Sequence, residues 1–178
     1  MNTLFAGVRK GDVVLAALLT ALGVALMVAD VTSDPDPGMR MDSRSWLMIP
    51  VFAVATLPLL WRRRSMLAVF AVTLAALTIH VLAFGWTVRC GAGLPLSIAL
   101  AYSAGRLMST RLSVVGLVAS VAVQVIVLVR DSAAGLAIIG VTAAIAAGAW
   151  GAGLWLRRRS AAASEVPAAT AAPVKSYV

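Results

Sequence analysis

Apolar residues are gathered into six long runs along the chain, and short polar segments rich in arginine separate them. A transmembrane helix needs about 20 mostly apolar residues to cross a hydrocarbon core of ~30 Å. The pattern therefore predicts an all-α fold, a polytopic membrane protein built as a six-transmembrane-helix bundle. The predicted helices cover residues 13–29, 46–61, 66–88, 91–105, 112–129 and 133–156.

The polar segments give the remaining domain organisation. Residues 1–12 are predicted to be a short cytoplasmic N-terminus, and residues 157–178 a basic, then disordered, cytoplasmic tail rich in Ala, Ser and Pro. The first run could also be the core of a cleaved signal peptide. It is longer than the roughly 7–15 residues usual for such a core, and no A-x-A-like site follows it. We therefore favour a retained helix.

Basic residues are distributed unevenly between the ends of these helices. With six crossings, eleven Lys and Arg residues lie on one side of the membrane and four on the other. The side richer in basic residues is normally cytoplasmic, which predicts an N-in/C-in topology. Two near-identical stretches, LLWRRRS at 59–65 and LWLRRRS at 154–160, then end two helices on the cytoplasmic side. Their predicted interface anchors are Trp61, Arg62, Arg63, Arg64, Trp155, Arg157, Arg158 and Arg159.

The shortest run, 91–105, tests this count. A helix of ~15 residues rises only ~22 Å at 1.5 Å per residue, so the bilayer must thin or the flanking arginines must snorkel. Without this crossing, the first triplet would lie on one side of the membrane. Arg106, Arg111 and the second arginine triplet would lie on the opposite side. A count of five helices would therefore break the charge rule.

The composition supports a membrane protein. Apolar residues make up 61% of the chain and charged residues 12%, against about 45–50% and about 25% in soluble domains. The net charge of +8 could indicate nucleic-acid binding. Because the basic residues lie at the ends of apolar runs, the topology rule explains them better, and we expect no nucleic-acid partner. The expected surroundings are a lipid bilayer with an anionic inner leaflet, in the plasma (inner) membrane of a bacterium.

Ionisable residues within a membrane helix are functional candidates, and His80 is the only one inside a predicted helix. Gln124 and Thr142 have comparable predicted depths in the outer half of the bilayer. The three side chains could form a polar pocket that senses a ligand or protons. They could equally form interhelical hydrogen bonds that fix helix packing.

Small residues recur at four-residue spacing in the last run, at Gly140, Ala144, Gly148 and Ala152. Such a stripe lets another helix approach closely. We expect its partner to be a neighbouring helix of the same bundle, and a homodimer stays open.

The sequence contains no recognisable catalytic motif. We find no nucleotide-binding loop, zinc-ligand spacing or nucleophile elbow, and only seven acidic residues. The single cysteine, Cys90, provides no metal site by itself. We therefore expect no enzyme activity, no catalytic residue, no metal and no cofactor.

The stretch TLPLLWRRRSMLAVFAVTLAALTIHVLAFGW at 56–86 resembles the N-terminal membrane (input) domain of actinobacterial sensor histidine kinases. The stretch LPLSIALAYSAGR at 94–106 and the final arginine cluster add to the resemblance, which covers roughly residues 10–160. In that family the last helix continues into a signalling helix and a kinase core. Only nineteen residues follow Arg159 here, and no phosphoacceptor or ATP-binding motif is present.

The resemblance implies a non-catalytic, sensor-like membrane module of a two-component system. It would act through a membrane partner, such as a histidine kinase or another membrane protein. The alternative is a small transporter or channel subunit, which a polar stripe along several helices would favour.

Overall fold

The computed structural model describes residues 7–34 and 38–165. These residues are mainly helical, and no strand occurs among them beyond one isolated bridge between Thr87 and Asp131. The elements are α1 (Lys10–Thr32), α2 (Met48–Thr56), the 3₁₀ helix η1 (Leu57–Trp61), α3 (Met66–Phe84), α4 (Cys90–Leu107), α5 (Thr110–Leu128), the 3₁₀ helix η2 (Leu136–Ile138) and α6 (Ile139–Glu165).

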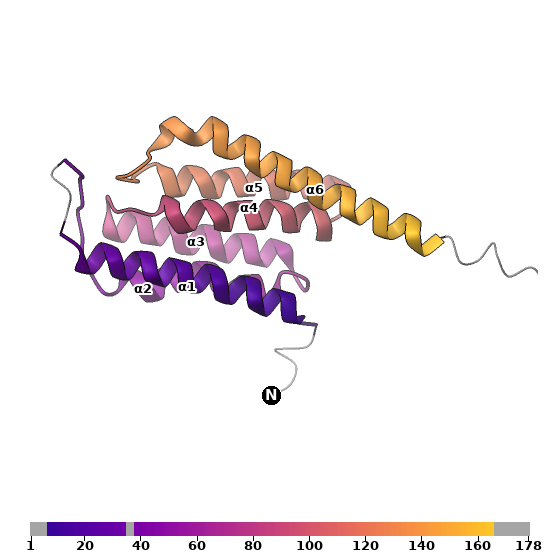
Figure 1. The fold of residues 1–178 in the computed structure, drawn as a ribbon, viewed down its shortest axis with the longest axis horizontal. Coiled ribbons are helices and arrows are strands. Elements are labelled where there is room, and N and C mark those ends of the chain that lie inside the picture. The colour runs from indigo at the N-terminus through magenta and orange to yellow at the C-terminus, as the bar shows by residue number, and fades with distance from the viewer. Residues whose placement is uncertain (1–6, 35–37, 166–178) are drawn as a thin grey trace, which may run out of the picture.

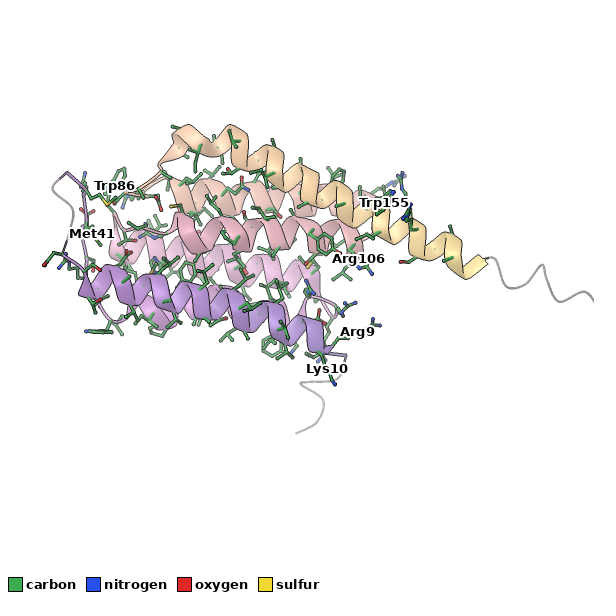
Figure 2. The ribbon with its side chains drawn as sticks, in the orientation of Figure 1. Arg9, Lys10, Met41, Trp86, Arg106 and Trp155 are labelled. Atoms are coloured by element: carbon green, nitrogen blue, oxygen red, sulfur yellow. The ribbon has the colours of Figure 1, made fainter. Side chains whose placement is uncertain are left out.

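Successive helical segments run in alternating directions and form a single bundle (Figure 1). α4 lies centrally and packs against α1, α5 and α6, while α2 packs against α1 and α3. The bundle therefore has two ends. Arg9, Lys10, Arg106 and Trp155 lie at the basic end, which includes residues 61–65 and 107–110 (Figure 2). Met41 and Trp86 lie at the opposite, loop end, which includes residues 33–34, 38–47, 85–90 and 129–138.

Four of the described helices are long and apolar enough to cross a membrane: α1, α3, α5 and the η2–α6 segment. The α2–η1 segment is shorter, and α4 is central and largely buried. Outward-facing leucines such as Leu18 and Leu82 are 64% and 70% exposed. An apolar surface of this kind suits a lipid environment, so the structure agrees with a helical membrane bundle.

The second predicted helix is broken near its end. α2 stops at Thr56, and residues 57–61 continue as a 3₁₀ helix with Pro58 in its first turn. Proline has no N–H to donate to the preceding turn, and its ring clashes with the carbonyl four residues earlier. The α-helix therefore gives way to a 3₁₀ helix, and the chain turns at the first arginine triplet itself, residues 62–64.

The boundary between the third and fourth helices differs from the predicted one. α3 ends at Phe84 and not at residue 88, because Gly85 takes φ 64°, a conformation that favours glycine. α4 begins at Cys90 and ends at Leu107, so the fourth segment is longer than predicted. The connection between the two helices is formed by residues 85–89, four of which were predicted to end the third helix.

Small residues allow two close contacts in the core. The ring of Phe52 occupies the space beside Gly23, where a Cβ atom would lie 2.4 Å from the ring. Near the basic end, a Cβ on Gly105 would lie 2.2 Å from the Trp150 carbonyl oxygen, and one on Gly153 would lie 2.4 Å from the Tyr102 carbonyl oxygen. The backbones of α4 and α6 therefore touch where these two glycines face each other.

The small-residue stripe of the last helix lies elsewhere. Gly140, Ala144, Gly148 and Ala152 are all exposed, and no atom lies within 4 Å of a Cβ built on either glycine. The buried face of α6 carries Thr142, Ala146 and Gly153. The expectation that the stripe packs inside the bundle is wrong, because the close approach uses the opposite face of α6.

The second arginine triplet does not end its helix. α6 continues through Arg159 to Glu165, so residues 160–165 are helical and not part of a disordered tail. Figure 1 shows this last part of α6 extending beyond the other helices. The rest of the predicted tail, residues 166–178, lies outside the described residues, as do residues 1–6 of the N-terminal segment.

Candidate functional site

Three aspartates from different segments converge on the turn at residues 85–90, which we call the hub turn. Asp30 of α1 accepts a hydrogen bond from the Val88 backbone N–H at 3.1 Å. Asp42, from the long loop before α2, accepts one from the Trp86 backbone N–H, also at 3.1 Å. The hub turn therefore ties α1, the long loop and the α3–α4 connection together.

Asp131 adds the connection between α5 and α6. Its Oδ2 accepts backbone N–H bonds from Arg89 at 2.6 Å and Cys90 at 2.7 Å, which satisfies donors at the start of α4. Its Oδ1 accepts backbone N–H bonds from Ala133 at 3.0 Å and Ala134 at 2.9 Å. One carboxylate thus joins the start of α4 to the turn that leads into α6.

The guanidinium of Arg89 lies at the centre of the hub turn and is fully buried. Its Nε donates to His80 Nδ1 at 2.9 Å, its Nη1 to the Arg130 carbonyl at 2.9 Å and its Nη2 to the Gly85 carbonyl at 2.6 Å. Burial lowers the pKa of Arg89 to about 10, while the nearby carboxylates of Asp131 and Asp30 act to raise it. The side chain stays charged at neutral pH and crosslinks two turns.

His80 belongs to this hub and not to a mid-membrane pocket. It lies four residues before the end of α3, ~6 Å along the helix axis, because α3 is shorter than predicted. Its ring packs edge-on against Phe52 and Phe84, with centroids 5.8 and 4.9 Å away. Since Nδ1 accepts a hydrogen bond from Arg89, it carries no proton and the ring is neutral. Its Nε2 is buried without a hydrogen-bond partner.

Gln124 and Thr142 do meet, and Ser97 of α4 joins them. The Thr142 hydroxyl donates to Gln124 Oε1 at 3.1 Å, and Gln124 Nε2 donates to Ser97 Oγ and to the Thr142 carbonyl, each at 3.1 Å. The amide is fully buried. These bonds link α4, α5 and α6. The predicted trio therefore separates into a Gln124–Thr142 pair and a histidine that bonds to Arg89.

A second buried charge cluster occupies the basic end. Asp12 is fully buried; its Oδ1 accepts from Arg62 Nε at 2.7 Å and its Oδ2 from Arg63 Nε at 2.8 Å. Arg62 also reaches Ser103 Oγ of α4 at 3.0 Å through Nη1. The Arg9 backbone N–H donates to Asp12 Oδ2 at 3.1 Å. Two arginines of the first triplet therefore bond to α1, and one of them also bonds to α4, so they help to hold the basic end together.

The second triplet makes fewer internal contacts. Arg157 donates from Nη1 to the Met108 carbonyl and from Nη2 to Thr110 Oγ1 at 3.1 Å, which fastens α6 to the α4–α5 turn. The Arg159 guanidinium lies 4.0 Å from the centre of the Trp155 ring, which is about half exposed. Both features suit side chains at an interface.

Asp42 shows how the hub turn is held at its exposed edge. The Trp86 N–H and the Arg40 side chain, 3.0 Å from Oδ1, lower the pKa of Asp42 below its ordinary value. The same Arg40 guanidinium lies 5.5 Å from the centre of the Trp86 ring. The carboxylate form is therefore the one that this corner stabilises.

In the part of the chain that the structure describes, no group of three or more His, Cys, Asp or Glu side chains is placed so that it could hold a metal ion. Cys90 is a free thiol in the first turn of α4.

Sequence reasoning missed the role of the acidic residues and of Arg89. A visible signal was available, because Asp12, Asp30 and Asp131 each stand next to an apolar run in a chain with only seven acidic residues.

Comparison of the chain with family models, with curated proteins and with solved structures finds no match. The assignment of a function therefore rests on the sequence and on this geometry.

Proposed function

We propose that the chain is a non-catalytic, sensor-like membrane module that passes the state of its loop end to a membrane partner through α6. The observation that carries the proposal is the position of Asp131, which bonds the start of α4 with one oxygen and the entry to α6 with the other. A change in the conformation of the hub turn would therefore alter the position of Ala133 and Ala134, which lead into α6.

The form of α6 supports an output role. It runs without a break from the loop end past the second arginine triplet to Glu165, beyond the other helices (Figure 1). The resemblance to the input domains of sensor histidine kinases points the same way, since their last helix leads to a signalling helix. The partner is then a histidine kinase or another membrane protein, and a second copy of the chain is the simplest variant.

Topology completes the proposal. Six crossings with both termini in the cytoplasm place the basic end inside and the hub turn outside, in the inner membrane of a bacterium, as the uneven distribution of arginines favours. The rival, a transporter or channel subunit, gains little support, because Gln124 and Thr142 bond to neighbouring helices instead of lining a path.

The coupling can be tested with two spin labels on the purified chain. In a Cys90→Ser background, cysteines replace Ser109 in the α4–α5 turn and Ala161 on the projecting part of α6, both exposed. Pulsed EPR gives the distance between them. We expect Asp131→Asn to shift or broaden the distance distribution, whereas Asp34→Asn, an exposed control at the same end, leaves it unchanged. Identical distributions in all three proteins would show that α6 does not respond to the hub turn.

A further inference from the structure

Two cavities meet beside the first arginine triplet. One, of about 300 Å³, is lined by Arg62, Arg63, Tyr102, Ser103 and Arg106, together with two leucines. The other, of about 760 Å³, is an apolar groove between α1 and α4, with one wall residue from α6. Arg62 and Tyr102 line both, so the polar cavity and the apolar groove are adjacent.

The polar cavity carries an excess of positive charge. Three guanidinium groups, those of Arg62, Arg63 and Arg106, line this cavity. Among the described residues, Asp12 is the one carboxylate that forms a salt bridge with any of them, which leaves two net positive charges. Asp12 and Ser103 hold Arg62 in place, so part of the arrangement is fixed before any ligand arrives. The planar donors of arginine match the oxygens of a phosphate group.

The apolar groove suits a hydrocarbon chain. It follows α1 from Gly11 to Leu19, a length of ~12 Å at 1.5 Å per residue. That distance approaches the thickness of one leaflet, about half of a ~30 Å hydrocarbon core. Val14 and Leu18 on its rim are 56% and 64% exposed, so the groove is open at the surface that faces lipid in a membrane.

We propose that these two adjacent cavities together bind one anionic phospholipid, with its phosphate at Arg62 and Arg106 and the upper part of an acyl chain in the groove. Basic pockets between helices on the cytoplasmic side are suited to anionic headgroups, and that leaflet supplies such lipids. A bound lipid would bridge α1, the arginine-rich turn after η1, and α4 at the basic end. The inference stands apart from the sensor role; it rests on these cavities and on the proposed topology, which puts the basic end in the cytoplasm.

The test measures phospholipid binding to the full chain in neutral detergent by native mass spectrometry. We expect phosphatidylglycerol to be retained in preference to phosphatidylcholine. Arg106→Gln should weaken its binding about fivefold, which corresponds to about 1 kcal/mol for one arginine at the surface of an anionic leaflet. The matched control Arg111→Gln removes an exposed arginine at the same end that lines neither cavity, and should leave binding unchanged.

A second pair of variants tests the groove without changing charge. Ala99→Phe fills the groove and should weaken binding, whereas Ala147→Phe on the exposed face of α6 should not. Melting in lipid-free detergent establishes that each variant is folded. Equal losses in Arg106→Gln and Arg111→Gln would overturn the proposal in favour of unspecific attraction. Competition by inorganic phosphate with no effect of Ala99→Phe would overturn it in favour of a soluble anion site.

Discussion

The stretches LLWRRRS and LWLRRRS share a tryptophan, an arginine triplet and a serine, yet they fold differently. The first follows the Pro58 break, forms a 3₁₀ helix and a turn, and ends at Ser65, whose Oγ accepts from the Ala68 N–H at 3.3 Å to cap α3. The second lies inside α6, where Ser160 Oγ donates back to the Leu156 carbonyl at 2.9 Å.

Their surroundings explain the difference. The first triplet has Asp12 within reach, so Arg62 and Arg63 both pair with this buried carboxylate. The second triplet has no carboxylate within 4 Å among the described residues, and its helix has no proline before it. The comparison teaches that a repeated basic motif can serve in one copy as a folded corner and in the other as an uninterrupted helix leading outward.

The largest expected effect removes the carboxylate that separates the two triplets. Asp12→Ala leaves Arg62 and Arg63 without their anion, and breaking a buried pair in this way costs about 3 kcal/mol, near the lower end of the range because Arg63 is partly exposed. Arg158→Ala in the second triplet should change stability by less than about 0.5 kcal/mol. Reversible unfolding in mixed micelles measures both. Equal effects would mean that the two triplets have equivalent surroundings.

The next effect concerns the contact that holds α6 against α4 near the second triplet. Gly105→Ala introduces a Cβ atom 2.2 Å from the Trp150 carbonyl oxygen, so the helix backbones must separate, at a cost of about 2–3 kcal/mol. The control Gly148→Ala meets no atom within 4 Å and should be neutral or stabilise the helix by up to about 1 kcal/mol. Thermal melts give the two values, and a neutral Gly105→Ala would contradict the close approach.

A smaller effect distinguishes the two serines. Ser65→Ala removes an N-cap bond and should lower stability by about 1 kcal/mol. Ser160→Ala removes a hydroxyl within a helix, where the change should stay within about 0.5 kcal/mol. The same unfolding assay measures the stability of both variants. A larger loss in Ser160→Ala than in Ser65→Ala would contradict the assignment of Ser65 as the helix cap.

The smallest effect lies at the loop end, away from both triplets. The pKa of Asp42 is lowered in the folded chain, so its contribution is present above the ordinary pKa of ~3.9 and is lost as the pH falls through the lowered folded value. Exchange of the Trp86 amide proton should accelerate below that pH, since protonation weakens the bond to Asp42 Oδ2. In Asp42→Asn the acceleration should be absent. A step of equal size in both proteins would assign it to another group.

Much of the fold follows from the sequence, because apolar runs have to be helices in a membrane. The errors in the predicted helix boundaries arise where a local feature has more influence on the backbone than the length of the apolar run. Gly85 ends α3 inside an apolar stretch, Pro58 breaks the segment after α2, and α6 continues through three arginines. Spacing alone predicted that Gln124 and Thr142 could pair, since both lie within long helices whose register holds.

The placement of His80 could not be obtained in this way. It depends on Arg89, which becomes buried only when Asp131, the Gly85 carbonyl and the Arg130 carbonyl are assembled around it. The face of α6 that packs inward is likewise chosen by Gly105 on another helix, which no pattern within α6 reveals. Contacts between distant segments decide both outcomes.

The central claim is that both triplets lie on the cytoplasmic side, separated by an even number of crossings. In a Cys90→Ser background, single cysteines at Ser33, Ser65 and Ala161, all exposed, report the side of each position in intact cells through a membrane-impermeant maleimide. The account predicts labelling at position 33 only, and labelling at all three after lysis. Labelling of position 65 or 161, but not both, in intact cells would place the triplets on opposite sides and contradict it.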